Sequence, residues 1–599
     1  MITTSSIARA LFATALAASL GCSGARPAPQ PVPVASASAT PLATPRPAAA
    51  FPAGFPYPLE AAKPVIGTKG MVVTDATIGS QVGRDMLAAG GNAIDAAVAT
   101  ALALAVVYPT AGNLGGGGFM VARVDGKMHS LDFRESAPAA ATRELYVGAD
   151  GKPNGASREG YKATGVPGSV AGLFAAHKKL GTKTWREVIA PAIKLAEEGF
   201  VVDAELARSL MESEKRFKKY PASMALYYAN GAPPAAGSTF KNPDLAKVLK
   251  RIAEKGPAGF YEGETAEAIA ADMKENGGLI TLADLKGYEA KWREPLTFSY
   301  RGHTVTSMPP PSSGGVTVAM IAHVVEGFEL SKLGFQSPAE LHVVFESMRR
   351  AFAARNARLG DPDFVKNPMD ELLSKQWADA QRATIAKDKA TPSTELGAPS
   401  TSGGTGPHTT HFSVVDEKGN AVALTTTLNW WYGFGAVVKG TGFVLNNEMD
   451  DFASVPGTAN GFGLVQSEPN VIQPGKRMLS SMAPTIVTAS DGHIVLVTGG
   501  AGGPTIINSV FQIMSNALDF GLSPVTAVNA PRFHMQHLPD VVMYEKNGLA
   551  PETQKALEAM GYTFKERGHI ADSPTLGFAN GVFVGAAEPR REGGAAMAR

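Results

Sequence analysis

The expected fold centres on one stretch, Pro407-His408-Thr409-Thr410-His411-Phe412-Ser413-Val414-Val415-Asp416, together with the residues that follow it. Residues 410–415 are mostly β-branched or aromatic in rough alternation, which predicts a strand. Asp416-Glu417-Lys418-Gly419-Asn420 has the composition of a tight turn, and the apolar, Thr-rich residues 421–428 predict a second strand. The two strands are therefore expected to form a hairpin.

The open end of this hairpin collects hydroxyl and amide groups. If the turn closes with Asp416 opposite Ala421, Thr409 faces Leu428, and Thr427 and Asn429 lie beside Thr409. A threonine hydroxyl becomes an effective nucleophile when its own α-amine acts as the base. Such an amine titrates near pH ~8, and cleavage of the chain before Thr409 would expose it. From these residues alone, a Thr-rich edge hairpin without a catalytic role is the simpler interpretation.

Motifs along most of the chain support the catalytic interpretation. The segments TTHFSVVDEKGNAVALTTTLN and GTGFVLNNEMDDF resemble the γ-glutamyltransferase (γ-glutamyl transpeptidase) family of N-terminal-nucleophile hydrolases. The resemblance extends over roughly residues 60 to 590, in the family's order, through GNAIDAAVATALAL, GNLGGGGFM, LDFRE, GVPGSVAGL, SMPPPSSGG, GDPDFV, KRMLSSMAPTIV, TGGAGG and NAPRFH.

The resemblance implies a fold and a maturation step. The fold is an α/β (α+β) four-layer αββα sandwich, formed from two subunits of one cleaved precursor. Cleavage between His408 and Thr409 would give a large subunit of residues 59–408 and a small catalytic subunit of residues 409–599, which stay together as a heterodimer.

The same resemblance implies a role for each site residue. Thr409 is the nucleophile, Thr427 hydrogen-bonds to it, and the amides of Gly502 and Gly503 stabilise the tetrahedral intermediate. For the γ-glutamyl donor, the α-carboxylate is held by Arg134, Ser480 and Ser481, and the α-amino group by Asn429, Glu448 and Asp451. This assignment is physically sensible, because a guanidinium and hydroxyls suit a carboxylate and carboxylates suit an ammonium.

The implied reaction is γ-glutamyl transfer through an ester on Thr409, to water or to an amino acid or dipeptide acceptor, with glutathione as donor and without cofactor or metal. Three alternatives stay open: a related acylase of the same fold acting on β-lactam side chains or poly-γ-glutamate, a catalytically dead surface binding protein, and a structural lipoprotein. The family's lid loop carries Tyr in some bacterial members, and Phe462 stands at that position here. A Phe cannot make the hydroxyl hydrogen bond that pins the lid shut, which leaves the balance between hydrolysis and transfer open.

Composition excludes several other classes of protein. Charged residues make up 18% of the 599 residues and the formal net charge is +1, so nothing indicates a nucleic-acid partner. The single cysteine, Cys22, rules out an intrachain disulfide and a cysteine metal site. The glycine run at 499–503 directly follows the expected strand 493–498, and in isolation it fits an oxyanion hole or a tight turn equally well.

The N-terminus has the pattern of an export signal. Arg9 precedes an apolar run, residues 10–20, and Ser19-Leu20-Gly21-Cys22 resembles a lipoprotein cleavage box in which Cys22 is lipidated. Residues 1–22 are thus expected to be a signal peptide of lipoprotein type, and the Pro/Ala-rich residues 23–58 a linker. The expected location is the periplasm or outer membrane of a bacterium, with membrane contact only through the N-terminal lipid. A plain secretory signal with an incidental cysteine is the alternative.

Three further expectations concern the folded body. The almost wholly apolar residues 94–107 predict a buried helix, and residues 184–199, 262–275 and 316–328 predict further helices. The four glycines at 115–118 lack a following Lys-Ser/Thr pair, which favours tight backbone packing over phosphate binding. Residues 387–406, polar and without periodicity, are expected to be exposed and flexible.

Overall fold

The computed structural model describes residues 50–58, 63–397 and 409–599. The signal-type segment, Cys22, most of the expected linker and His408 lie outside the described residues. Within the described part, no helix is long and apolar enough to cross a bilayer.

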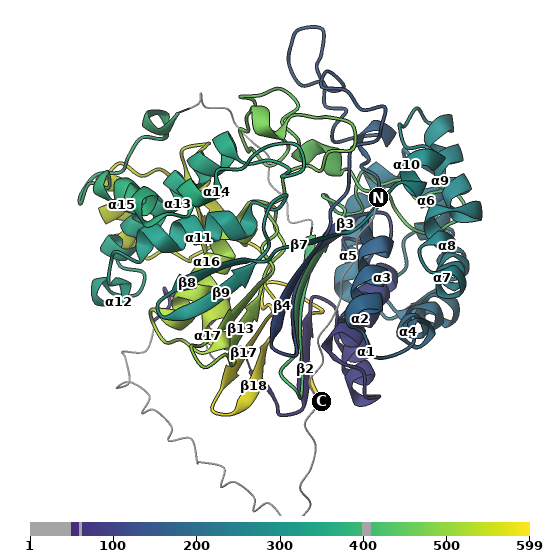
Figure 1. The fold of residues 1–599 in the computed structure, drawn as a ribbon, viewed down its shortest axis with the longest axis horizontal. Helices are drawn as coiled ribbons and strands as arrows, with labels where there is room; N and C mark the ends of the chain where they lie inside the picture. The colour runs from purple at the N-terminus through teal and green to yellow at the C-terminus, as the bar shows by residue number, and fades with distance from the viewer. Residues whose placement is uncertain (1–49, 59–62, 398–408) are drawn as a thin grey trace, which may run out of the picture. The chain divides into compact units, whose positions relative to one another are not determined.

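Two large antiparallel sheets form the centre of the described fold (Figure 1). The expected hairpin, residues 409–427, lies inside the first sheet. Its seven strands run in the order β19 (Ala595–Ala598), β2 (Gly70–Thr74), β10 (Thr409–Asp416), β11 (Ala421–Thr427), β3 (Gly117–Val124), β4 (Lys127–Phe133) and β7 (Lys291–Arg293). The second seven-stranded sheet runs in the order β1 (Val65–Gly67), β18 (Val582–Ala586), β17 (Thr575–Ala579), β13 (Ile494–Thr498), β12 (Thr485–Thr488), β9 (His303–Ser307) and β8 (Leu296–Tyr300).

The strand sequences explain why the two sheets stack. Successive side chains of a strand point to opposite faces, so a strand that is apolar throughout can pack on both sides. In β2, Met71 and Val73 join the core between the sheets, whereas Val72 joins the core under the helices. In β10, Phe412 and Val414 face the helices, and the intervening residues therefore face the second sheet. Both faces of the strands β2, β10 and β11 are buried, as in a sandwich covered on each side.

A helical layer covers the outer face of each sheet, so the expected αββα sandwich is confirmed (Figure 1). The layer over the first sheet contains α1 (Thr77–Ala88), α2 (Ala93–Val107), α3 (Ser169–Leu180), α4 (Trp185–Glu198), α5 (Ala204–Phe217), α6 (Pro221–Tyr227), α7 (Pro243–Lys255), α8 (Ala258–Tyr261), α9 (Gly263–Glu275) and α10 (Leu282–Lys286). The layer over the second contains α11 (Gly314–Val325), α12 (Leu330–Leu333), α13 (Pro338–Arg358), α14 (Met369–Leu372), α15 (Lys375–Ala383), α16 (Thr505–Leu518), α17 (Pro524–Asn529) and α18 (Pro551–Ala559).

Short elements complete the described chain. They are the strands β5 (Phe200–Val201) and β6 (Thr239–Phe240), the small sheet of β14 (Phe533–His534), β15 (Val542–Glu545) and β16 (Phe564–Arg567), and the 3-10 turns η2 (Tyr161–Ala163), η3 (Ser393–Leu396), η4 (Glu448–Asp451) and η5 (Glu468–Asn470). The turn η4 matters most for function, because it carries two of the expected site residues.

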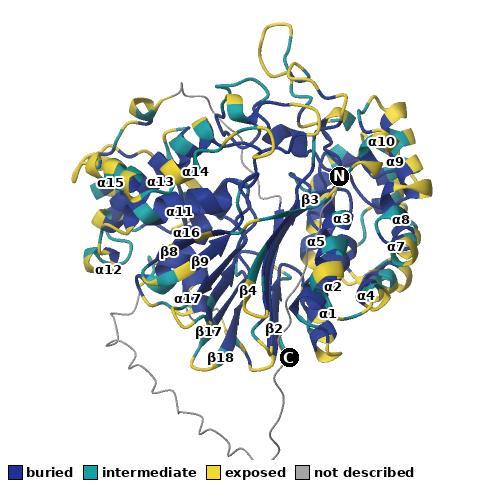
Figure 2. Ribbon diagram, in the orientation of Figure 1, coloured by how far each residue is buried: buried dark blue, intermediate teal, exposed yellow. Residues whose placement is uncertain are grey.

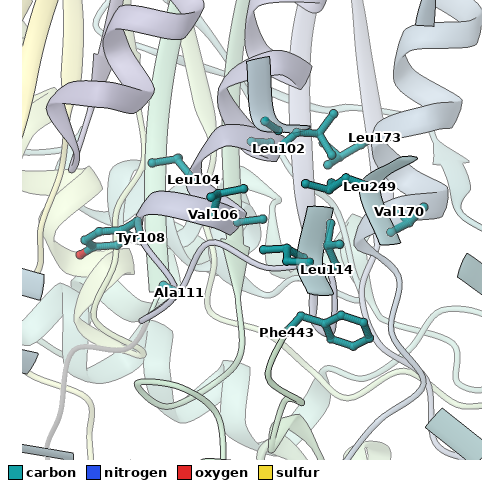
Figure 3. Close-up of a cluster of buried hydrophobic side chains, with 14 of the residues drawn as sticks. Leu102, Leu104, Val106, Tyr108, Ala111, Leu114, Val170, Leu173, Leu249 and Phe443 are labelled. Carbon is teal, nitrogen blue, oxygen red and sulfur yellow. The ribbon is translucent and has the colours of Figure 1, made fainter. Parts of the chain in front are cut away.

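The buried helix expected at 94–107 is α2, and every one of its residues is buried. Asn92 and Asp95 cap its start in a capping box, which satisfies backbone N–H groups that would otherwise lack partners. Figure 3 shows its Leu102, Leu104 and Val106 among side chains from α3, α7 and neighbouring loops. Figure 2 shows that burial runs through both sheets and the inner helices, while exposed residues line the outer helices. The expected helices at 184–199, 262–275 and 316–328 correspond to α4, α9 and α11.

The hairpin of β10 and β11 forms as expected, but the expected register was wrong by one residue. Val415, and not Asp416, pairs with Ala421, so Thr409 lies opposite Thr427 and not opposite Leu428. The cause is the Asp416 side chain, which accepts hydrogen bonds from the backbone of Lys418 and Asn420 and makes Asp416 part of the turn. Its carboxylate also accepts a bond from Ala93 N at the start of α2, which fixes the turn against the helical layer.

Tight packing is confirmed for the glycines at 115–118. A Cβ at Gly116 would lie 2.1 Å from Thr427 O, and one at Gly118 would lie 2.3 Å from Thr425 O. The glycines therefore allow the backbone of β3, and of the two residues before it, to lie directly against the end of β11.

Two segments pack more closely than their composition indicates. In the expected linker, Phe55 is buried, and the Arg590 guanidinium lies 4.8 Å from the Tyr57 ring centre. In the segment expected to be exposed, Ser393 is fully buried and donates a hydrogen bond to His537 O. Most of the described residues 387–397 are exposed, as expected, and Ala390 and Ser393 are the buried exceptions. Residues 398–406 lie outside the described residues.

Candidate active site

Thr409 is the first residue of β10. Strand alternation places its side chain on the same face as His411 and Ser413, toward the second sheet. Thr409 Oγ1 lies 3.4 Å from Thr427 Oγ1 on the neighbouring strand, and the Thr427 hydroxyl accepts a 2.8 Å hydrogen bond from Asn429 N. The side chain of Asn429 in turn donates to Asn447 O. The hydroxyl–hydroxyl–amide group expected from the sequence is therefore assembled at this point.

The end of β11 is held by a residue that sequence reasoning did not single out. Asn113 Nδ2 donates to Thr427 O at 2.9 Å and to Thr426 Oγ1 at 3.1 Å, and Asn113 Oδ1 accepts from Gly116 N at 2.9 Å. Asn113 belongs to the GNLGGGG motif, which the sequence analysis had noted. The sequence did not indicate that Asn113 would bond to the end of β11. These bonds fix the Thr427 backbone, and with it the hydroxyl that faces Thr409.

A glycine-rich loop contacts β10, the strand that begins with Thr409. It follows β13, and a Cβ at Gly499 would lie 2.4 Å from the His411 ring, so the loop and the nucleophile strand are in close contact. Gly502 and Gly503 have φ values of 139° and 61°, which favour glycine. Among the described residues, neither of their backbone N–H groups has a hydrogen-bond partner. Two such donors next to a nucleophile have the composition of an oxyanion hole.

A buried ionic cluster occupies the other end of the site. Arg134 directly follows β4 and is 1% exposed. Its guanidinium donates to the carboxylates of Glu448 and Asp451, both from η4, and it lies 3.8 Å from Glu135. Gln466 and Asn470 donate to Asp451 O and so hold η4 in place. The sequence assigned Arg134 and the two η4 carboxylates to opposite ends of a ligand, and here they contact one another directly.

Burial and mutual charge perturb every group in this cluster. Burial raises the pKa of Glu448 and of Asp451, against the opposing effect of the Arg134 charge. Burial also raises the pKa of Glu135 to about 7, even though Arg134 lowers it. For Arg134 the carboxylates outweigh burial, and its pKa is raised, so it stays protonated. Three carboxylates thus surround one guanidinium, and a further positive charge bound here would be stabilised by them.

Ser480 and Ser481 are placed by a contact between two segments far apart in sequence. The backbone of Ser480 bonds to Pro311 O and accepts from Ser313 N, so the turn at 309–313 supports it. Both serines are nearly buried, with 2% and 7% of their surface exposed. The SMPPPSSGG and KRMLSSMAP motifs therefore meet in space, which no spacing argument could have shown.

Phe462 lies over the glycine loop. A Cβ at Gly503 would lie 2.9 Å from its ring, and only 8% of Phe462 is exposed. The loop that carries it is anchored by Asn460, whose Oδ1 accepts from the backbone of Phe462 and Leu464. The expected lid position is therefore at the site, with an aromatic ring packed on the expected oxyanion loop.

These groups line one small cleft. Ten of the expected site residues line it: Arg134, Thr409, Thr427, Asn429, Glu448, Asp451, Phe462, Ser480, Ser481 and Gly503. Gly502 does not line the cleft, although it adjoins Gly503. His408 and Cys22 lie outside the described residues. Four apolar residues also line the cleft and were not expected: Leu464, Met482, Pro504 and Ile506. The sequence also did not point to Arg355, a buried arginine behind Ser481. Arg355 lies in the Arg-rich helix α13, and a helix of that composition is normally expected to be exposed to solvent.

A threonine at the start of a central strand, facing a glycine loop inside an αββα sandwich, is the arrangement of an N-terminal-nucleophile hydrolase. Comparison with known families agrees: the gamma-glutamyltranspeptidase family model matches residues 79–598. The chain belongs to this family.

Individual relatives are similar over most of their length. The glutathione hydrolase proenzyme of Pseudomonas sp. (strain A14) is 47% identical over 547 residues, which cover 89% of this chain and 95% of the relative. Cephalosporin acylase from Bacillus halodurans has a TM-score of 0.80 at 29% identity, covering 92% of this chain and 99% of its own. Helicobacter pylori gamma-glutamyltranspeptidase has a TM-score of 0.53 at 45% identity, covering 54% of this chain and 93% of its own.

Proposed function

We propose that this chain cuts itself between His408 and Thr409 and then uses Thr409 to cleave γ-glutamyl amides. The chain is an enzyme of the γ-glutamyltransferase and glutathione hydrolase type, processed from a proenzyme, as its relatives are. The observation that carries the assignment to Thr409 is the single cleft in which this hydroxyl, Gly503 of the glycine loop and a buried ionic cluster meet.

Maturation would proceed by an N-to-O acyl shift. The Thr409 hydroxyl attacks the carbonyl carbon of His408, its proton passes to the departing Thr409 nitrogen, and an ester replaces the peptide bond. Water then hydrolyses the ester, leaving a carboxylate on His408 and a free α-amine on Thr409. The 3.4 Å separation between the Thr409 and Thr427 hydroxyls supports this step, because Thr427 can orient the attacking oxygen.

The ionic cluster supports a zwitterionic donor. Arg134 carries one positive charge beside two carboxylates, Glu448 and Asp451, so the cluster can accept the ammonium of a donor. The donor's α-carboxylate would bind Arg134 together with the hydroxyls of Ser480 and Ser481, and its α-amino group would bind Glu448, Asp451 and the Asn429 side chain. Held at both charges, the γ-carbonyl reaches Thr409, and such positioning lowers a barrier by several kcal/mol, of order ~7 in favourable cases.

Turnover would use the new α-amine as general base. The amine accepts the Thr409 hydroxyl proton as Oγ1 attacks the γ-carbonyl, and the oxyanion accepts hydrogen bonds from Gly502 N and Gly503 N. The amide nitrogen leaves with a proton, and a γ-glutamyl ester remains on Thr409. Water gives glutamate, and the amine of an amino acid or dipeptide gives a new γ-glutamyl amide. The proposed donor is glutathione, and every group used belongs to the chain itself.

Export also belongs to the proposal. The pattern of residues 1–22 supports a bacterial signal peptide, and Cys22 supports attachment to a lipid. The enzyme would then act in the periplasm or at the outer membrane, with residues 23–49 as a spacer.

An acylase that accepts a glutaryl group is the second candidate, favoured by the structural similarity to cephalosporin acylase. A glutaryl donor lacks the α-amino group, so it would leave the second carboxylate of the Arg134 cluster without a partner. The test is direct competition between glutathione and a glutaryl amide for the purified, processed enzyme. Release of glutamate with little glutarate is expected, and preferential release of glutarate would overturn the assignment of the donor.

A further inference from the structure

Arg355 differs from the other fully buried arginines of the described fold in its lack of an ion pair. Five arginines are among its largest fully buried side chains, and four of these form ion pairs with carboxylates: Arg134, Arg349, Arg350 and Arg532. Arg355, near the end of α13, is 0% exposed and forms no ion pair with any described residue. A buried guanidinium that no carboxylate contacts directly is costly, so its retention indicates that its charge is used.

The hydrogen-bond partners of Arg355 are neutral, and one of them, Ser481, lines the cleft. Nε donates to Ser313 Oγ at 2.9 Å, and Nη1 donates to Gln466 Oε1 at 3.0 Å and to Asn356 Oδ1 at 2.9 Å. Nη2 donates to Ser481 Oγ at 3.4 Å. The guanidinium therefore lies directly behind one of the two serines that line the cleft.

These bonds orient both serines. When Ser481 Oγ accepts from the guanidinium, its own O–H is directed away from Arg355, and a ligand carboxylate in the cleft is an acceptor for it. Ser313 accepts from Arg355 and donates to Ser480 O at 2.5 Å, so the backbone of the second serine is fixed as well. Gln466 connects the same guanidinium to Asp451 O at 2.9 Å. One buried cation thus adjoins both ends of the expected donor site.

The charge of Arg355 persists at neutral pH. Burial lowers its pKa to about 10, and the nearby Asp451 opposes that effect. An unpaired positive charge at this depth is weakly screened, so it adds to the attraction that Arg134 exerts on an anionic ligand.

We propose that Arg355 is a positioning residue that selects donors carrying an α-carboxylate, acting through Ser481 and through its unpaired charge. This inference rests on the proposed function of the cleft. Arg355 itself does not line the cleft, so it touches neither the nucleophile nor the reacting carbonyl.

The test compares two donors that differ only in the α-carboxylate, L-γ-glutamyl-p-nitroanilide and 4-aminobutyryl-p-nitroanilide. The variants are Arg355→Met and Arg355→Lys, and the control is Arg358→Met, which removes an arginine of the same helix that pairs with Glu371 at the surface. Completed self-cleavage verifies that each variant folds.

For Arg355→Met, KM for the γ-glutamyl donor should rise about tenfold or more with a smaller change in kcat, because a charged hydrogen-bond donor acting on ground-state binding has been lost. The ratio of kcat/KM between the two donors should fall by a similar factor. Arg355→Lys should restore part of the loss, and Arg358→Met should keep the wild-type ratio.

Equal losses on both donors, or an unchanged KM, would overturn the proposal and leave Arg355 a purely structural residue. If Arg355→Met is not processed, Arg355→Lys decides alone: a wild-type donor ratio would contradict the proposal, and a lowered ratio would support it. Failure of the underlying function has a different signature, since the wild-type enzyme would then hydrolyse neither donor.

Discussion

Replacing Asp451 with asparagine tests the electrostatic design of the donor site. The substitution preserves the shape of the side chain and removes one negative charge. Arg134 would still pair with Glu448, so the buried guanidinium is not left without a counter-charge and the fold should persist. What changes is the number of carboxylates available to an incoming ammonium, which falls from two to one.

The expected magnitude follows from the lost contact. A hydrogen bond between charged groups contributes about 1.5–3 kcal/mol, so kcat/KM for a γ-glutamyl donor should fall by roughly 10- to 150-fold in Asp451→Asn. A glutaryl donor has no ammonium to lose and should change by less than about threefold. The preference for γ-glutamyl over glutaryl should therefore shrink by one to two orders of magnitude.

The assay measures kcat/KM for L-γ-glutamyl-p-nitroanilide and glutaryl-p-nitroanilide on processed enzyme. Asp450→Asn is the matched control, because Asp450 lies in the same turn but bonds to Ser157 and Gly461 N and does not line the cleft. The control should keep the wild-type ratio between the two donors. Equal losses on both donors in Asp451→Asn, or the same change of ratio in Asp450→Asn, would show that the Asp451 carboxylate does not bind the ammonium of the donor.

Three further substitutions test separate parts of the account. Thr427→Val should slow both self-cleavage and turnover by about 10-fold or more. It should also destabilise the fold by ~1–3 kcal/mol, because the buried Asn429 N–H loses its acceptor. Cleavage time courses and urea unfolding measure these effects, and wild-type rates would contradict the prediction. Phe462→Tyr supplies the missing lid hydroxyl and should raise the ratio of transfer to hydrolysis with glycylglycine as acceptor; an unchanged ratio would remove the lid hydroxyl from the explanation. Burial, assisted by Asp519, raises the pKa of Glu340 to about 8, so the folded state holds a proton that the unfolded state releases near pH 4.5. Stability should therefore fall as pH rises from about 4.5 to 8, by a few kcal/mol at most, and the slope of Tm against pH should be smaller in Glu340→Gln; identical slopes would contradict this.

Much of the architecture could be predicted from the sequence, because local patterns specify it. The apolar run of α2 and the alternation in β10 each allow few alternatives, and the order of motifs led to the αββα sandwich. The hairpin register could not be predicted reliably. Turn composition left two closures open, and the choice was made by the Asp416 carboxylate and its tertiary bond to Ala93 N.

The site, too, could be predicted only in part from the sequence. Residues that belong to distinctive motifs, such as Thr409 and Arg134, were placed in one cleft by the fold. The direct ion pairs of Arg134 with Glu448 and Asp451 were not expected, since motif spacing carries no information about contacts across more than 300 positions. Arg355 was missed because its burial depends on how α13 packs, and polar character alone predicts exposure.

The central claim is that Thr409 becomes the N-terminal residue of a small subunit by its own chemistry. The most direct measurement is the intact mass of the purified protein lacking residues 1–22, followed over hours at 37 °C beside Thr409→Ala. Two fragments that divide between His408 and Thr409 in the parent protein, and one uncut chain in Thr409→Ala, are the predicted result. A parent chain that stays uncut, or a variant that is cut at the same bond, would contradict the account.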